Sequence, residues 1–132
     1  MNTDIRVAVL IEKDGKFLLG QEATKIIYGL WNWQQGKVED GEDLEAAAMR
    51  EVKEETGFDI EIVKKLTIIN NPFPGTKETH VYLGKIIGGE LAYSAEEILN
   101  LKWFTREQII EIQDKLSGNW LVGVIDSLDL SQ

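Results

Sequence analysis

The chain has 132 residues, of which 43% are hydrophobic, so it is long and apolar enough for one compact core, and we expect a single domain over residues 1–132. It contains no cysteine, which excludes a disulfide framework and a zinc–thiolate site. The formal net charge of −9 disfavours binding to duplex nucleic acid, and the lack of an apolar run of signal or transmembrane length predicts a cytoplasmic protein with no membrane partner.

The N-terminal residues predict a β-hairpin. Residues 5–11 are mostly β-branched and are typical of a strand, Asp14-Gly15 supplies a tight turn, and residues 16–19 begin a second strand. An aromatic-rich segment, residues 28–35, leads to a second turn at Asp40-Gly41. The chain therefore opens with β-structure and turns just before its first helix.

A helix is predicted over Leu44–Thr56. Asp43 is a suitable N-cap residue, and Gly57 ends the helix as a C-cap. Apolar residues at positions 44, 48 and 52 form a stripe along one side of this helix. The stripe indicates that one face packs on a core while the other faces solvent.

The second half of the chain predicts further strands and short helices. The segment Asn-Asn-Pro-Phe-Pro-Gly at residues 70–75 cannot continue either neighbouring strand, so we expect a loop there. Thr105 to Gln108 matches a capping box that opens a helix. The expected elements are strands over residues 60–69, 80–87 and 101–104 and helices over residues 109–116 and 120–128.

Three glutamates on the first helix form a concentrated negative charge. Glu51, Glu54 and Glu55 lie at positions i, i+3 and i+4, which places their carboxylates on one side of the helix. Like charges at this spacing repel, so the arrangement needs either a compensating cation or extensive solvation. Mg²⁺ suits such a cluster because it prefers oxygen ligands and fills its remaining positions with water and phosphate oxygens, and Mn²⁺ is an alternative ion.

The same helix carries a resemblance to a known family. Gly36, Glu42 and the run Arg-Glu-Val-Lys-Glu-Glu-Thr-Gly-Phe at residues 50–58 match the whole Nudix box at its fixed spacing. The chain resembles small bacterial Nudix phosphohydrolases. This resemblance implies an α+β fold, a three-layer α/β/α sandwich around a mixed β-sheet, with the box forming a loop-helix-loop at the active site.

The resemblance also implies roles for the residues of the box. Glu51, Glu54 and Glu55 would hold the divalent ions, and the carbonyl group of Gly36 would be a further ligand. Arg50 would orient a ligand carboxylate, with Glu42 steadying the loop against it.

A general base outside the box is also implied by the resemblance. Glu97 is the first candidate for this catalytic role and for an additional metal ligand. Glu96 and the glutamates of the box are the alternatives for the base.

Candidate substrate contacts lie in the aromatic segment and in two loops. Trp31 and Phe73, together with Trp33 and Tyr28, have flat rings that can stack on a base, although core packing explains such residues more often. Two lysines can contact phosphate groups, unless they are merely solvated; they are Lys37 and Lys77.

Other phosphate and hydrolase chemistries find little support in the sequence. No Walker-type phosphate loop and no Gly-x-Ser-x-Gly elbow is present, and the single histidine, His80, lies in a strand-like segment and is expected to be structural. Two segments depart from the usual family pattern: Gln34-Gln35 replaces the common proline and glycine, and Gly20-Gln21-Glu22 stands where arginine is common. These departures weaken any inference about the substrate.

The sequence therefore predicts a Mg²⁺-dependent hydrolase that cleaves a phosphoanhydride bond. The expected substrate is a small molecule, either a nucleoside di- or triphosphate or a nucleoside diphosphate linked to another moiety. The alternatives are a non-catalytic module that senses a nucleotide, an RNA 5′-pyrophosphohydrolase, which the net charge of −9 disfavours, and an acidic structural domain. The expected assembly is a monomer or a homodimer.

Overall fold

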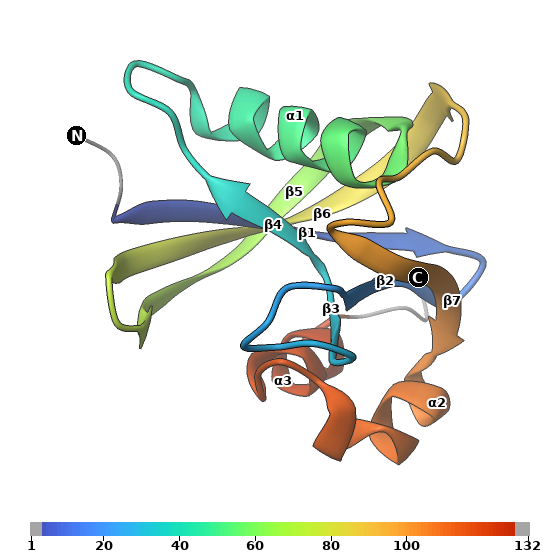
Figure 1. The fold of residues 1–132 in the computed structure, drawn as a ribbon. Helices are drawn as coiled ribbons and strands as arrows, with labels where there is room; N and C mark the ends of the chain where they lie inside the picture. The colour runs from blue at the N-terminus through green and yellow to red at the C-terminus, as the bar shows by residue number, and fades with distance from the viewer. Residues whose placement is uncertain (1–3, 129–132) are drawn as a thin grey trace.

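The structure is a computed structural model that describes residues 4–128 (Figure 1). Its elements are β1 (Ile5–Lys13), β2 (Lys16–Glu22), β3 (Trp31–Asn32), β4 (Gln34–Lys37), α1 (Leu44–Thr56), β5 (Phe58–Phe73), β6 (Thr76–Gly89), β7 (Ile98–Thr105), α2 (Arg106–Glu111), the 3₁₀-helix η1 (Gln113–Lys115) and α3 (Trp120–Asp126). Among these described residues, no helix is long and apolar enough to cross a membrane.

The strands form a mixed sheet between two layers of helix. The strand order is β3-β2-β1-β6-β5, while β4 pairs with β1 and β7 pairs with β2. Strands β1 and β6 run parallel, whereas the other pairings are antiparallel. Helix α1 lies on one side of the sheet and α2 and α3 lie on the other (Figure 1). The expected α+β class and α/β/α sandwich are confirmed.

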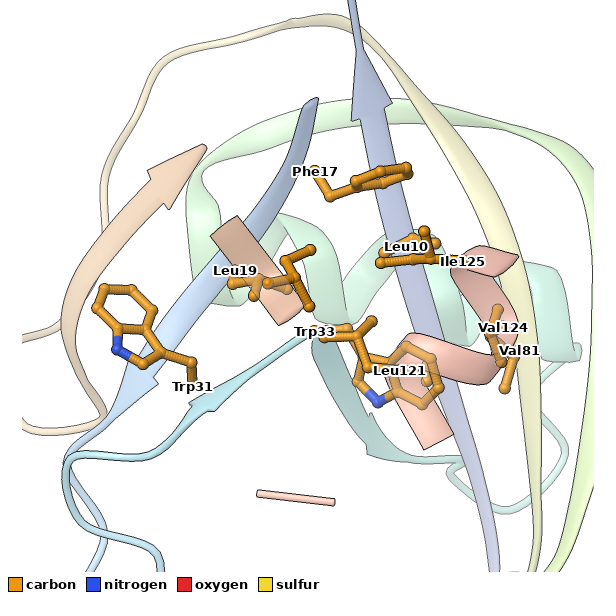
Figure 2. Packing of buried hydrophobic residues seen from close by; sticks show 11 residues of the cluster. Leu10, Phe17, Leu19, Trp31, Trp33, Val81, Leu121, Val124 and Ile125 are labelled. Carbon is orange, nitrogen blue, oxygen red and sulfur yellow. The ribbon is translucent and has the colours of Figure 1, made fainter. Parts of the chain in front are cut away.

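The core is divided between the two sides of the central strand β1. Ala8 and Leu10 belong to the cluster that includes residues of α2 and α3, which Figure 2 shows. Val7 and Val9 belong to the cluster that packs on α1. This division follows from the twofold alternation of side chains along a strand. Because both faces of β1 are buried, its sequence is an almost continuous apolar run.

Helix α1 has the ends that its sequence predicts. The side chain of Asp43 accepts a hydrogen bond from the backbone N–H of Ala46, at 3.1 Å, which caps the N-terminus. Gly57 has a φ of 84°, a left-handed conformation that favours glycine, and its N–H donates to the carbonyl of Lys53. The caps fix where the helix begins and ends, and therefore which way its glutamates point.

Two expectations for the second half of the chain are wrong. Residues 70–75 are not a loop, because β5 continues to Phe73 and only Pro74-Gly75 separates it from β6. A register irregularity between Asn70 and Phe73, with Asn71 at a φ of 49°, makes room for the intervening proline. The helix expected over residues 109–116 begins earlier, at Arg106, and gives way to η1 after Glu111.

Candidate active site

A cavity of about 500 Å³ lies between strand β4 and the side of α1 that carries the glutamates of the box. We call it the acidic cavity because most of its charged lining is carboxylate. Its charged lining residues are Arg6, Glu22, Lys37, Glu51, Glu54, Glu55 and Glu97. Gly36 and Gln35 of β4 and Ile98 of β7 complete much of the wall. The three box glutamates predicted to act together are thus brought together with Gly36 and Glu97.

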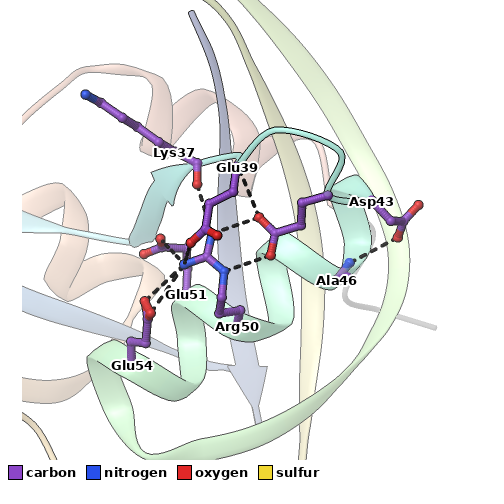
Figure 3. Close-up of polar contacts among 8 residues, drawn as sticks. Lys37, Glu39, Asp43, Ala46, Arg50, Glu51 and Glu54 are labelled. Carbon is purple, nitrogen blue, oxygen red and sulfur yellow. Dashed lines mark hydrogen bonds and ion pairs between the residues drawn. The ribbon is translucent and has the colours of Figure 1, made fainter. Parts of the chain in front are cut away.

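Arg50 connects the loop before α1 to the glutamates on the helix (Figure 3). Its Nε and Nη2 donate to the two carboxylate oxygens of Glu42 at 2.7 and 2.9 Å, a bidentate pair. Its Nη1 donates to Glu51 at 2.9 Å and to Glu54 at 3.0 Å, and its Nη2 also donates to the carbonyl of Lys37 at 3.0 Å. The hydrogen bonds from Arg50 lower the pKa of Glu42 to about 2. Arg50 therefore holds the loop, β4 and two helix carboxylates in one network.

Glu51 and Glu55 crowd one another inside the cavity. Burial raises the pKa of Glu51. Burial, followed by the hydrogen bond and the charge of Glu51, raises the pKa of Glu55 well above its ordinary value. The carboxylate of Glu55 also accepts a hydrogen bond from the backbone N–H of Gln35 at 3.4 Å. Two neighbouring carboxylates that resist ionising together would be relieved by a cation placed between them.

The donor atoms suit a hard divalent cation, although their present contacts are with protein. Within residues 4–128, no three His, Cys, Asp or Glu side chains are already arranged to hold a metal ion, and Arg50 pairs with Glu51 and Glu54. The close approach of β4 to α1 also fits, because a Cβ atom at position 36 would collide with the carboxylate of Glu51. Oxygen-only donors next to a glycine backbone match the preference of Mg²⁺ or Mn²⁺.

Glu97 reaches the cavity from the turn that precedes β7. The N–H of Glu97 donates to the carbonyl of Ser94 at 3.1 Å, and its carbonyl accepts from the N–H of Ala23 at 3.0 Å. Glu22 lies on the same wall, where burial, more than the nearby charge of Glu97, raises its pKa. Glu96, the alternative candidate, is exposed and does not line this cavity.

The predicted substrate contacts separate into different parts of the molecule. Lys37 lines the acidic cavity, whereas Lys77 lines a separate hollow at the β5–β6 turn. Trp31 is 8% exposed, packs edge-on against Phe104 at 4.9 Å and belongs to the core (Figure 2). Phe73 lines both this hollow and a larger cavity next to the acidic cavity. Trp33 is buried in the core and Tyr28 is exposed.

A second cavity of about 640 Å³ adjoins the first, and we call it the apolar groove. The two cavities share Arg6, Thr24, Ile27 and Gln35 in their walls. The remaining groove residues include two aromatic side chains, Phe73 and Trp120, and the buried amide of Asn32. Flat aromatic surface with a few polar groups is the usual lining of a small-molecule site.

Several residues of the two cavities were missed by the sequence analysis, namely Arg6, Glu22, Asn32 and Trp120. Arg6 gave a usable signal, because it is a charged residue directly before the apolar run of residues 7–11 in strand β1. Trp120 was interpreted only as part of a terminal helix, and nothing in its local pattern distinguishes a groove residue from a core residue. These positions come from different elements: strand pairing brings the first three together, and packing of α3 on the sheet adds Trp120.

Comparison with known proteins gives a consistent result. The family model described as the NUDIX domain matches residues 1–122. The oxidized purine nucleoside triphosphate hydrolase of Danio rerio is 35% identical over 104 residues, which cover 76% of this chain and 65% of that protein. The NAD-capped RNA hydrolase NudC of Escherichia coli strain SMS-3-5 is 31% identical over 103 residues, which cover 78% of this chain and 39% of that protein. The chain thus spans less than two thirds of the length of these relatives.

A solved structure extends the similarity to the whole fold. The NUDIX hydrolase from Nitrosomonas europaea superposes with a TM-score of 0.82 at 25% sequence identity. The match covers 93% of this chain and 86% of the other. The similarity therefore extends beyond the acidic helix α1 to the sheet and to the helices on its other side.

Proposed function

Because this chain belongs to the Nudix hydrolase family, we propose that it hydrolyses a phosphoanhydride bond with Mg²⁺, or Mn²⁺ in its place, as cofactor. The proposed substrate is a nucleoside di- or triphosphate, or a nucleoside diphosphate linked to another moiety. The observation that carries the proposal is the acidic cavity with the apolar groove beside it. The cavity suits the cation and the phosphates, while the groove has the size and aromatic lining to hold a nucleoside.

The side chains of the box have two proposed tasks, which are to bind the ion and to orient its ligands. Glu51, Glu54 and Glu55, with the carbonyl of Gly36, would hold the ion. A bound divalent ion supplies a water of lowered pKa and neutralises charge on the phosphoryl oxygens. Arg50 orients Glu51 and Glu54 through the hydrogen bonds described above.

Hydrolysis then needs an acceptor for the proton of the attacking water. Glu97 is the proposed acceptor, because it lines the cavity from the turn before β7 and is not among the carboxylates to which Arg50 donates. A water oxygen forms a bond to phosphorus, the bridging P–O bond breaks, and the leaving phosphate departs with its negative charge. Lys37, which also lines the cavity, is a proposed contact for phosphate oxygens.

A role on the 5′ end of RNA is the second candidate. It is supported by the similarity to the E. coli NAD-capped RNA hydrolase, and it is disfavoured by the net charge of −9. A nucleotide sensor without catalysis is less well supported. Such a module has no need for three clustered carboxylates and an arginine that orients two of them.

A substrate panel tests the proposal. Nucleoside di- and triphosphates, nucleoside diphosphate conjugates and a 5′-triphosphorylated RNA are incubated with the protein and Mg²⁺. Release of orthophosphate is measured separately from release of pyrophosphate, and cleavage of the conjugates is followed by the nucleoside monophosphate that it forms. Glu54→Gln and Glu55→Gln are assayed beside the wild type. We expect each substitution to lower kcat by about 100-fold or more, because a neutral amide is a poor ligand for the ion.

The surface pair Glu107→Gln and Glu111→Gln on α2 provides matched controls, since both residues lie outside the acidic cavity. Each control should retain the wild-type kcat. Wild-type activity in both Glu54→Gln and Glu55→Gln would contradict the assignment of the site. Absence of hydrolysis by the wild type across the whole panel would contradict the enzymatic function itself.

A further inference from the structure

Arg6 occupies the boundary between the two cavities. It is one of the few residues that line both the acidic cavity and the apolar groove. Its position follows from sheet pairing, because Arg6 is the cross-strand neighbour of Lys37 on β4 and of Thr79 on β6. Its Cζ lies 5.6 Å from the centroid of the Phe73 ring, so the guanidinium makes a cation–π contact with an aromatic residue of the groove.

The side chain of Arg6 is half-buried and incompletely paired. Its Nε is buried and has no hydrogen-bond partner, and within residues 4–128 Arg6 makes no ion pair with any carboxylate. Desolvation lowers its pKa, against the opposing influence of Glu51, Glu55 and Glu22. A buried guanidinium donor without a partner carries a desolvation cost that an incoming acceptor would offset.

The ligand that fits this position is an anion between the two cavities. Suppose that a nucleoside lies in the apolar groove and that the scissile phosphorus lies beside the glutamates. The phosphate attached to the nucleoside then lies next to Arg6, because Arg6 lines both cavities. A planar guanidinium offers parallel donors to phosphate oxygens, which makes it well suited to that group. Of the residues lining the acidic cavity, Arg6 and Lys37 are the cations, and only Arg6 also borders the groove.

We propose that Arg6 binds the 5′-phosphate adjacent to the nucleoside and so selects substrates in which a nucleoside carries the phosphate chain. This proposal rests on the proposed function, whose substrate class it narrows. The competing explanation is that Arg6 only balances the charge of the glutamates. The two explanations differ in what they predict for binding of a phosphate group, as distinct from binding of a nucleoside.

The test compares each of the common nucleoside 5′-monophosphates with its own nucleoside. Affinities are measured by calorimetry in the presence of Mg²⁺, and the compounds contain no phosphoanhydride bond, so the readout is independent of turnover. We expect the wild type to bind at least one monophosphate about 10- to 100-fold more tightly than its nucleoside. Arg6→Met, which keeps an apolar stem against Phe73, should bring this ratio close to one while the nucleoside affinity stays the same.

Two further variants make the result specific. Arg106→Met removes an exposed arginine that pairs with Asp126 far from both cavities, and it should keep the wild-type ratio. Arg6→Lys should give an intermediate ratio, because an ammonium group presents a point charge rather than a planar fork. If Arg6→Met does not fold, Arg6→Lys carries the test, and an unchanged ratio in it overturns the proposal.

The possible outcomes are distinguishable. A wild-type ratio of one for every pair, an Arg6→Met ratio equal to that of the wild type, or an equal loss of monophosphate and nucleoside affinity overturns the role of Arg6. If the wild type also hydrolyses members of the substrate panel, only this inference fails. If the ratio depends on Arg6 but no phosphoanhydride is cleaved, the phosphate site stands and the proposed hydrolase function fails.

Discussion

Glu97 is the candidate general base, and a single carboxylate-to-amide substitution tests this role. Glu97 and its neighbour Glu96 are both exposed, but Glu97 lines the acidic cavity and Glu96 does not. We expect Glu97→Gln to lower kcat by about 100-fold and to flatten the acidic limb of the pH profile, because an amide cannot accept the proton of the attacking water. The measurement is kcat/KM against pH for the best substrate of the panel.

Glu96→Gln is the matched control for this prediction, since it makes the same chemical change one residue away. It should leave both turnover and the pH profile as in the wild type. An unaltered profile in Glu97→Gln would move the role to Glu96 or to a glutamate of the box. A loss of activity in Glu97→Gln with the shape of the profile preserved would instead indicate a ligand role.

At the scale of residues, the sequence alone predicts which site residues lie together when they belong to the same helix. Glu51, Glu54 and Glu55 share a side of α1 because of the helical repeat, so spacing alone was sufficient to group them. Arg6 and Glu22 reach the same cavity from β1 and β2, and their positions depend on strand pairing that no local spacing encodes. Trp31 illustrates the converse, because an aromatic residue near the box lies in the core.

At the scale of elements, the termini of α1 were predictable because their signals are local. Asp43 and Gly57 act through hydrogen bonds within a few residues of themselves. The hairpin of β5 and β6 was not predictable in the same way. The proline at position 72 argues against a regular strand, yet the irregular register between Asn70 and Phe73 lets β5 continue past it. Long-range pairing thus overrode a local signal.

The cap of α1 gives a quantitative prediction about stability. Asp43→Ala removes the acceptor for the N–H of Ala46, so we expect a loss of about 1 kcal/mol in the free energy of unfolding and a fall of about 3–5 °C in Tm. Asp43→Asn should be close to the wild type, because an asparagine side chain also accepts this hydrogen bond. Thermal and urea unfolding measure both effects. Equal stability of Asp43→Ala and Asp43→Asn would show that the cap contributes little.

At the scale of the whole molecule, the net charge of −9 sets which large substrates can approach the cavity. The acidic cavity adds its own carboxylates at the point of entry. A small nucleotide brings few charges and can arrive with its counterion. An RNA chain brings one further charge per nucleotide, and these charges extend over a surface that repels them.

This difference predicts a salt-dependent choice between nucleotide and RNA. At about 20 mM salt, we expect kcat/KM for a nucleoside triphosphate to exceed that for a short 5′-triphosphorylated RNA by about tenfold, and the gap should narrow towards 200 mM, because screening weakens repulsion over more than about 10 Å. An oligonucleotide with uncharged methylphosphonate linkages and the same 5′-triphosphate controls for chain length, and its ratio to the nucleotide should not change with salt. A preference for the charged RNA at low salt would mean that a basic path attracts the chain despite the net charge, and it would favour the 5′ end of RNA as the substrate.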